Sequence, residues 1–492
     1  MVSFRRKSRF GARVRSSTGL PLLALACASG ASPERSMSLT PCRLDGLGAA
    51  AQCGSLRVFE DREARTGREI DLRVAVVPAL AARPRPDPLF ILVGGPGQAA
   101  TQAGAQLAET LSAVRQQRDI VLVDQRGTGG SNPLACESDR AQPLAEAFAP
   151  HAELAEMRAC HASLDADTTL YATPMAMADL DEVRESLGYA TLNLWGGSYG
   201  TRAALVYLRQ YPERVRSVIL DGSAPAALTL PLYVARDTQR ALDLLFDDCA
   251  ADADCQRTFP SARDDFRALL ASLEAHPLET TLVHPRLGES TQLRIERAGV
   301  ASAVRNMLYV PQLAALLPLA IERSKLSDYG TFVAAFDAFM SGVEVSTGMF
   351  LSIVCAEDVP RFDEQRAVEL TQGTFLDGKW LLDLKAQCES WPAARLPEAY
   401  FEPVVSDVPS LLLSGNLDPV TPPSWGELVA QSLPQSRHVV VPGAGHGTTP
   451  LGCIPDLIAD FLEDLAPARL DASCVERIRR PPYFTSLQGP QP

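Results

Sequence analysis

The sequence predicts an α/β protein with a mostly parallel sheet, interrupted by an inserted helical cap. The chain has 492 residues, and domains usually hold ~100–200, so we expect one domain with an insertion, or two domains. Hydrophobic residues make up 46% and charged residues 21%, as in an ordinary globular protein. Short apolar runs alternate with helical stretches both before residue 225 and after residue 400, which is typical of a parallel sheet.

The first two strands are expected to form an antiparallel hairpin. Leu56 to Asp61 and Ile70 to Val77 are rich in β-forming residues and flank a polar turn that holds Gly67. The later runs are mostly continuous, as in strands that are buried on both faces. These predicted strands are Leu89–Val93, Ile120–Val123, Leu192–Trp195, Val218–Leu220, Ser410–Leu413 and His438–Val441.

The inserted segment has helical patterns in place of strands. Leu242–Phe246, Asp264–Leu273 and Pro311–Arg323 are examples. We therefore expect four regions: an export signal at 1–31, the first part of the core at 40–225, a helical cap at 226–400, and the last part of the core at 401–478.

The N-terminal segment has the pattern of a bacterial export signal. A short apolar run, Leu20 to Ala28, follows a basic stretch and precedes small residues. Ala24-Leu25-Ala26 before Cys27 suits ordinary signal peptidase and also, loosely, a lipoprotein signal that would anchor the chain at Cys27. We expect a secreted or periplasmic protein. The basic residues are Arg5, Arg6, Lys7, Arg9, Arg13 and Arg15.

Charge and hydropathy exclude two classes of partner. The formal net charge is −13, which leaves no basic surface to neutralise the phosphates of a nucleic acid. No apolar run after the first thirty residues is long enough to span a bilayer. We expect no nucleic-acid partner and no transmembrane span in the mature chain.

The remaining cysteines favour disulfides. Ten is an even number, and in an exported chain it indicates five bridges. Neighbours in sequence close the shortest loops at the least entropic cost, so we expect sequential pairing. A zinc site is disfavoured because no CxxC pair or histidine cluster accompanies them, and no motif calls for a cofactor. The ten are Cys42, Cys53, Cys136, Cys160, Cys249, Cys255, Cys355, Cys388, Cys453 and Cys474.

A nucleophile motif follows one of the predicted strands. Gly196-x-Ser198-x-Gly200 stands between an apolar run and a helical stretch. Small residues two before and two after the serine allow the sharp strand-to-helix turn that exposes a nucleophile. The pattern predicts that Ser198 is a catalytic nucleophile.

An activated serine needs a base and an acid that orients the base. His446 lies in the glycine-rich loop after the last predicted strand, so it is the expected base. Asp418 follows the preceding strand and is the favoured acid. Asp221, at the end of the strand after the nucleophile, is the alternative acid.

The oxyanion that forms during acyl transfer needs two N–H donors. One is expected from Tyr199, directly after the nucleophile, and the other from the loop Gly94-Gly95-Pro96-Gly97 after an earlier strand. Pro96 has no N–H, so Gly95 is the expected donor.

Together these motifs resemble the α/β-hydrolase superfamily, and within it the branch of proline iminopeptidases and tripeptidyl aminopeptidases. The resemblance covers about residues 50 to 475. It rests on Gly94–Gly97, Asp124-Gln-Arg-Gly-Thr-Gly-Gly-Ser131, Gly196–Gly200, Gly415-Asn-Leu-Asp418 and Gly445-His446.

The resemblance implies the α/β-hydrolase fold and a secreted serine hydrolase that releases residues from free peptide N-termini. It implies that Ser198 is the nucleophile, that Asp418 orients the base, and that His446 is general base and then acid. Asp124 and Arg126 would hold the loop beside the site. Many iminopeptidases have a histidine at the position of Val93, so the departure there weakens the iminopeptidase assignment only.

The resemblance also implies an acidic cap residue that binds the substrate's ammonium group. Cys355-Ala-Glu-Asp358 is similar to a segment of the tripeptidyl branch, and Glu357 is the expected binding residue. The alternative is that Glu357 and Asp358 are solvated or cap a helix.

We therefore expect a serine hydrolase that acts without a cofactor on a peptide or small ester. The leading hypothesis is an aminopeptidase of tripeptidyl or prolyl type that works through an acyl-enzyme. A carboxylesterase would use the same nucleophile and oxyanion donors. The third hypothesis is a non-catalytic binding module that retains only the fold.

Overall fold

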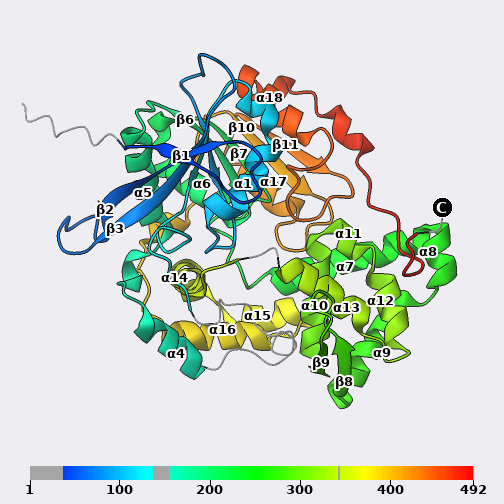
Figure 1. Cartoon of the computed structure of the whole chain (residues 1–492). Coiled ribbons are helices and arrows are strands. Elements are labelled where there is room, and N and C mark those ends of the chain that lie inside the picture. The colour runs from blue at the N-terminus through cyan, green and yellow to red at the C-terminus, as the bar shows by residue number, and fades with distance from the viewer. Residues whose placement is uncertain (1–36, 137–153, 342–343, 491–492) are drawn as a thin grey trace, which may run out of the picture. The chain divides into compact units, whose positions relative to one another are not determined.

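The computed structural model, which describes residues 37–136, 154–341 and 344–490, contains a nine-stranded sheet (Figure 1). The expected export signal at 1–31, with Cys27, lies outside the described residues. The strands, in spatial order, are β1 (Thr40–Cys42), β2 (Ala51–Phe59), β3 (Glu69–Val77), β5 (Ile120–Val123), β4 (Leu89–Leu92), β6 (Leu192–Gly197), β7 (Val215–Asp221), β10 (Ser410–Gly415) and β11 (Ser436–Val441).

The sheet is antiparallel at one edge and parallel over the rest. β1, β2, β3 and β5 pair antiparallel in that order, and every pairing from β5 to β11 is parallel. Each residue of β4 and β5 is buried, which explains why these strands are continuous apolar runs. All eight predicted strands lie in this sheet, so the predicted fold class is confirmed. β1 was missed because it has only three residues, one of them Pro41.

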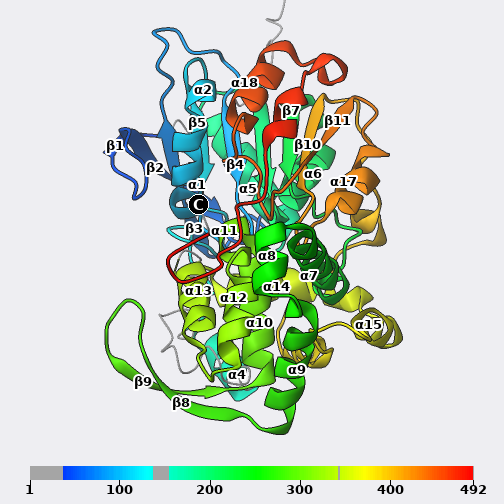
Figure 2. The ribbon, with the colours of Figure 1, turned by 90° about the vertical axis from the view of Figure 1, so that its right-hand side faces the viewer.

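Helices connect the parallel strands and lie beside them (Figure 2). Such connections are needed because a parallel strand can be reached only by a crossover. They are α1 (Ala100–Thr110), α2 (Ser112–Arg115), α4 (Leu154–Ser163), α5 (Thr173–Ser186), α6 (Tyr199–Gln210) and α17 (Pro423–Ala430), and α18 (Ile454–Asp464) follows the last strand.

The inserted segment between β7 and β10 is mainly helical, but it also contains a two-stranded antiparallel hairpin that was not expected. The hairpin strand β8 is partly exposed along its whole length, so it lacks the buried alternation that marks a strand in a sequence. The elements are α7 (Val234–Ala251), α8 (Ala253–Thr258), α9 (Ala262–Ala275), β8 (Leu278–Val283), β9 (Ser290–Ile295), α10 (Arg297–Tyr309), α11 (Pro311–Ala314), α12 (Leu317–Ser324), α13 (Gly330–Met340), α14 (Thr347–Glu357), α15 (Glu364–Thr371) and α16 (Lys379–Glu389).

The helices of the insertion do not all pack into one core. α7 to α13 share an apolar cluster that includes Leu245, Phe266 and Phe332, and Figure 1 shows these helices gathered together. α14 instead contributes Met349 and Ile353 to the apolar cluster that packs against the sheet. The described residues of the sheet and of the insertion group as one compact unit, and the bounds of the helical cap stay a prediction.

Five disulfides join the cysteines in the neighbouring pairs expected from the sequence. In the part of the chain that the structure describes, no helix has the length and apolar character needed to cross a membrane. The bridges are Cys42–Cys53, Cys136–Cys160, Cys249–Cys255, Cys355–Cys388 and Cys453–Cys474.

Candidate active site

Ser198 occupies the turn between β6 and α6. Its φ of 55° and ψ of −124° lie outside the regions that residues other than glycine usually adopt. Its N–H donates to the main-chain oxygen of Asp221 at the end of β7 (2.9 Å). Such a strained turn between a buried strand and a helix is the geometry that presents a nucleophilic side chain.

The glycines around Ser198 are required by close backbone approaches. A Cβ on Gly200 would lie 2.0 Å from the main-chain oxygen of Leu92, and one on Gly196 would lie 2.4 Å from that of Gly200. A Cβ on Gly94 would lie 2.9 Å from the Cβ of Ser198. Side chains at these positions would therefore push the serine out of place.

Asp418 and His446 are brought together from the loops after β10 and β11. Nδ1 of His446 donates to Oδ2 of Asp418 at 2.8 Å. The other carboxylate oxygen accepts the backbone N–H groups of Val420 and Thr421, both at 2.8 Å. The carboxylate is fully buried, whereas the histidine side chain is 15% exposed. This is the arrangement in which an acid fixes the tautomer and orientation of a base.

The pKa values of this pair shift in opposite directions. Burial alone would raise the pKa of Asp418, but the charge and hydrogen bond of His446, with the backbone N–H groups, hold it below its usual value. Burial alone would lower the pKa of His446, but Asp418 and, less strongly, Asp221 raise it above 6.5. The pair thus favours an ionised carboxylate and an imidazole that readily takes up a proton.

The alternative acid, Asp221, does not contact the imidazole. Its two carboxylate oxygens accept the backbone N–H and the hydroxyl of both Thr448 and Thr449, at 2.7–3.0 Å. These residues lie two and three positions after His446. Asp221 therefore holds the histidine loop, and its main-chain oxygen accepts the N–H of Ser198.

Two residues at the site were not expected from the sequence. Thr421 Oγ1 donates to Oδ2 of Asp418 (2.9 Å) and lies 3.2 Å from Nδ1 of His446. The main-chain oxygen of Tyr309, on α10, accepts the N–H of His446 (3.0 Å), and its ring meets the imidazole edge-on with centroids 5.1 Å apart. Thr421 could have been found, because an aspartate often accepts N–H groups two and three residues later in a turn. Tyr309 comes from the insertion and gave no such signal.

Ser198 makes no hydrogen bond to His446 within the described ranges. Catalytic hydrogen bonds are often long before substrate binds and shorten in the complex with substrate. Asp221 connects the two residues: its main-chain oxygen accepts the N–H of Ser198, and its carboxylate accepts N–H groups of the loop that holds His446. In addition, a Cβ on Gly222, the residue after Asp221, would lie 3.4 Å from Cε1 of His446 and 3.6 Å from Oδ2 of Asp418.

The two expected oxyanion donors, Tyr199 and Gly95, stay predictions, and each is next in sequence to a residue at the nucleophile turn. Tyr199 is the first residue of α6, and the first N–H groups of a helix have no acceptor within it. Gly95 lies in the loop after β4 with a φ of 111°, beside Gly94, which contacts Ser198. A positive φ of this size is open to glycine but costly for other residues.

Asp124 and Arg126 anchor the loop that follows β5. Asp124 accepts the N–H and hydroxyl of Thr101, at the start of α1, and the N–H of Gly130. Arg126 is fully buried and makes a two-pronged ion pair with Asp179 at 2.6 and 2.9 Å. Both residues hold backbone in place, as the resemblance implies.

Glu357 is placed differently from the expectation. It is fully buried, and its carboxylate accepts the N–H of Thr173 (2.8 Å), the hydroxyl of Tyr400 (2.5 Å) and Nη1 of Arg202 (3.4 Å). Asp358 completes the pairing of Arg202 with two contacts of 3.0 Å. Glu357 is therefore not solvated. It accepts the N–H of the first residue of α5, so it caps a helix, as the alternative interpretation allowed, and its binding of a substrate amine stays a prediction. Burial raises its pKa, although Arg202 opposes the shift.

A family model for the alpha/beta hydrolase fold matches residues 87–449 of this chain. The chain belongs to the α/β-hydrolase family. Serine protease Hip1 of Mycobacterium tuberculosis is 26% identical over 468 residues, which cover 86% of this chain and 88% of that protein. A proline iminopeptidase of Arabidopsis thaliana is 23% identical over 325 residues, 65% of this chain and 69% of the relative.

This α/β hydrolase is a serine hydrolase enzyme, so the hypothesis of a non-catalytic binding module is set aside. Among solved structures, a proline iminopeptidase of Mycobacterium smegmatis aligns with 84% of this chain and 99% of its own, with a TM-score of 0.41 and 17% identity. This weak likeness adds nothing to the assignment.

Proposed function

We propose that this α/β hydrolase is an exported peptidase, of tripeptidyl or prolyl type, that cleaves peptides from a free N-terminus through an acyl-enzyme. The observation that carries the proposal is the 2.8 Å contact between His446 and Asp418 beside the strained turn of Ser198. The names of the relatives, serine protease and proline iminopeptidase, favour an amide substrate.

In this proposal, His446 takes the proton of Ser198 as Oγ attacks the carbonyl carbon of the substrate. The carbonyl electrons move onto oxygen, and the N–H groups of Tyr199 and Gly95 stabilise the resulting oxyanion. The intermediate collapses as His446 gives its proton to the leaving amine. A water molecule then attacks the acyl-enzyme by the same route and restores Ser198.

A carboxylesterase is the second candidate. The position of Glu357 supports this candidate. Glu357 was expected to bind the substrate's amine, but it is paired with Arg202, and an esterase needs no amine-binding acid. Amide and ester hydrolysis use the same nucleophile, base and oxyanion donors, so the chemistry of the site fits both.

The decisive experiment compares three substrates: a free alanyl-prolyl-alanyl anilide, its N-acetylated form, and a short-chain ester. Cleavage of the free-amine peptide alone supports the aminopeptidase, whereas cleavage of the ester alone assigns a carboxylesterase. Ser198→Ala should abolish all activity, and Ser272→Ala, an exposed serine on α9, is the matched control. Full activity of Ser198→Ala would refute the proposed nucleophile.

We propose that the protein is exported to an oxidising compartment. Five disulfides support this, because such bridges persist mainly outside the cytosol. Mass spectrometry of the N-terminal peptide of protein produced in a bacterial host tests it. A new N-terminus near residue 31 supports export, and a lipid-modified Cys27 supports anchoring. An intact leader contradicts both.

A further inference from the structure

Arg305 is a cation without a carboxylate partner beside the candidate active site. It lies on α10, where Nη2 donates to the hydroxyl of Tyr309 (3.0 Å) and Nη1 to Oδ1 of Asn306 (3.3 Å). Nε is buried without a hydrogen-bond partner. Among the described residues, Arg305 forms no ion pair with a carboxylate, and it is partly exposed. Only two of the five N–H donors of the guanidinium are therefore used.

Arg305 is placed against the histidine through Tyr309. The two residues are four apart on one helix, so their side chains share a face. The guanidinium lies 5.4 Å from the ring centroid of Tyr309, and that ring packs on the imidazole of His446. After burial, Asp418 and Asp221, Arg305 is the next group that acts on the pKa of His446, and it lowers it.

Two other arginines of the insertion have carboxylate partners. Arg286 pairs with Asp337 at 2.6 Å, and Arg297 with Asp377 at 3.0 Å. The chain as a whole has 59 acidic and 46 basic residues, so acidic partners are plentiful. A partly buried charge costs free energy unless it is paired. An unpaired guanidinium also opposes the positive charge that His446 must gain in the reaction.

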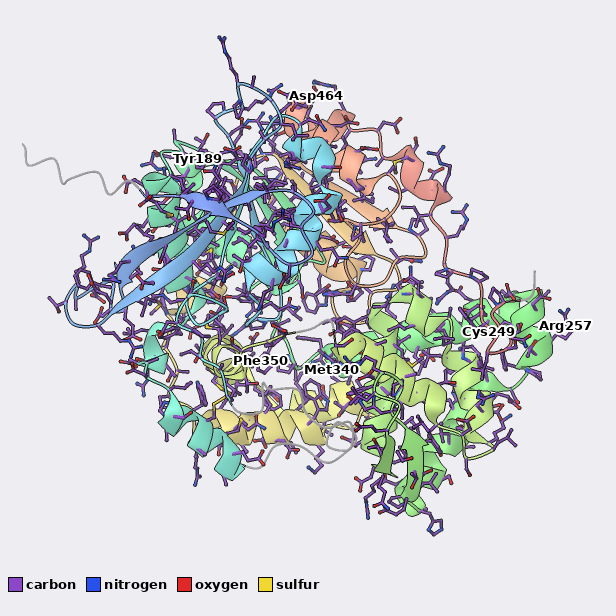
Figure 3. The ribbon with its side chains drawn as sticks, viewed as in Figure 1. Tyr189, Cys249, Arg257, Met340, Phe350 and Asp464 are labelled. Atoms are coloured by element: carbon purple, nitrogen blue, oxygen red, sulfur yellow. A yellow bond between two sulfur atoms is a disulfide. The ribbon has the colours of Figure 1, made fainter. Side chains whose placement is uncertain are left out.

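The neighbours of Arg305 hold it in position. Asn306 is buried, and its Nδ2 contacts Sδ of Met340 at the end of α13 (3.8 Å; Met340 is labelled in Figure 3). The ring of Tyr309 also packs on Phe339, with centroids 5.4 Å apart. A guanidinium fixed in this way loses little conformational entropy when it binds a planar anion through two parallel N–H···O bonds.

We propose that Arg305 binds a carboxylate of the substrate, so that the enzyme prefers substrates with a negative group near the bond it cleaves. The inference deepens the proposed function and rests on it. Two sources supply this chemistry in a peptide: the free C-terminal carboxylate of a short peptide, and an aspartate or glutamate side chain. A bound carboxylate would neutralise Arg305 and remove its penalty on the protonation of His446.

The test compares kcat/KM for three peptides that differ in charge: alanyl-prolyl-alanyl-alanine as the free acid, the same peptide as the C-terminal amide, and alanyl-prolyl-alanyl-glutamate amide. A charge-assisted contact predicts that one of the acidic peptides is preferred over the neutral amide by about 10- to 100-fold. Preference for the free acid alone assigns the terminal carboxylate, and preference for the glutamate peptide assigns the side chain.

The measured ratio is kcat/KM for the preferred acidic peptide divided by kcat/KM for the neutral amide. Arg305→Gln should bring this ratio close to one. Arg305→Lys should retain part of the preference, because lysine keeps the positive charge but lacks the two parallel N–H donors of a guanidinium. Arg267→Gln, at a 68% exposed position on α9, should leave the ratio unchanged. Labelling of Ser198 by a fluorophosphonate shows that each variant is folded. An unchanged ratio in Arg305→Gln overturns the inference, as does a wild-type enzyme that cleaves all three peptides equally.

The same ratio measured on nitrophenyl esters separates the inference from the proposed function. Nitrophenyl butyrate is neutral, and the nitrophenyl monoester of glutaric acid carries a carboxylate. If peptides are not cleaved but the charged ester is preferred through Arg305, the peptidase proposal fails and the carboxylate site stands. If peptides are cleaved without any preference for charge, the peptidase stands and the carboxylate site fails.

Discussion

Ser198, His446 and Asp418 show how the local environment sets the chemistry of a single side chain. The backbone strain at Ser198 costs on the order of 1–3 kcal/mol, and the hydrogen bond from its N–H to Asp221 helps to hold it. The buried carboxylate of Asp418 is kept ionised by four donors: Nδ1 of His446, Oγ1 of Thr421 and two backbone N–H groups. The imidazole in turn is held in one orientation.

The first prediction concerns the pH dependence of the proposed reaction. The base works when His446 is neutral, so kcat/KM should rise as pH increases through the pKa of His446, which lies above 6.5. Asp418→Asn removes the group that raises this pKa. The midpoint of the profile should therefore move to lower pH, and kcat should fall by about 10⁴-fold.

The pH profile of kcat/KM for both enzymes checks this. Asp264→Asn, at a 79% exposed position, is the control and should change neither value. If the pH profile of Asp418→Asn has the same midpoint as that of the wild type, then Asp418 neither orients His446 nor stabilises its positive charge.

Two connections between secondary-structure elements position the site. The first joins the end of β7 to the loop after β11, because Asp221 accepts the hydrogen bonds of Thr448 and Thr449. The second joins α6 to the end of α14, because Arg202, one turn after Ser198, pairs with Glu357 and Asp358. The elements that carry nucleophile and base are thus fixed by buried charges.

Asp221→Asn is predicted to damage the histidine loop. An amide has one acceptor oxygen and would point N–H donors at the N–H groups of Thr448 and Thr449, and each unsatisfied buried donor costs about 1–3 kcal/mol. A shift of His446 by about 1 Å can lower the rate by about 100-fold. We expect a lower unfolding midpoint in urea and a lower kcat, with KM little changed. A raised KM at constant kcat would instead place Asp221 in substrate binding.

Glu357→Gln is predicted to affect stability more than substrate binding. The variant removes the charge that faces Arg202 in the interior, so we expect a loss of about 1–3 kcal/mol in the free energy of unfolding. KM for a peptide with a free N-terminus should not change. Glu389→Gln, at a 69% exposed position in a surface ion pair, should lose less than about 1 kcal/mol.

Urea unfolding and KM measurements on Glu357→Gln and Glu389→Gln test whether Glu357 acts in stability or in substrate binding. A large rise in KM for the free-amine peptide, with stability unchanged, would restore Glu357 as the residue that binds the substrate's ammonium group.

At the scale of the whole molecule, the disulfides are spread along the chain and each closes a local loop. Loop length determines how much each bridge restricts the unfolded chain. Cys249–Cys255 encloses the shortest loop, with a separation of 6 residues, and Cys355–Cys388 the longest, with a separation of 33. The longest bridge also ties the end of α14, which bears Glu357, to α16.

Removal of the two bridges should therefore have unequal effects. Loop entropy predicts a loss of about 4 kcal/mol for the double alanine variant of Cys355 and Cys388, and about 2 kcal/mol for that of Cys249 and Cys255. Urea unfolding of both variants measures the difference. Equal losses, or a greater loss at the short loop, would contradict the entropic origin of the stabilisation.

The sequence by itself predicted eight strands of the main sheet, the cysteine pairs, and the contact between Asp418 and His446. These depend on local signals: apolar runs bounded by turns, short cysteine spacings, and glycines on both sides of Ser198. Asp418 was favoured over Asp221 because of its position after a strand, and the structure places it on His446. Hairpin β8–β9 was missed because β8 has no buried residue and β9 buries only Leu293 and Ile295.

Only the tertiary structure decided what the buried charges do. Glu357 could not be assigned from its neighbours in sequence, because its partner Arg202 lies 155 residues away on α6. Tyr309 and Arg305 reach His446 from the insertion, across more than a hundred positions of chain. A charge acquires its role from whatever faces it in a medium of low polarity, and that depends on packing between distant segments, which no local pattern encodes.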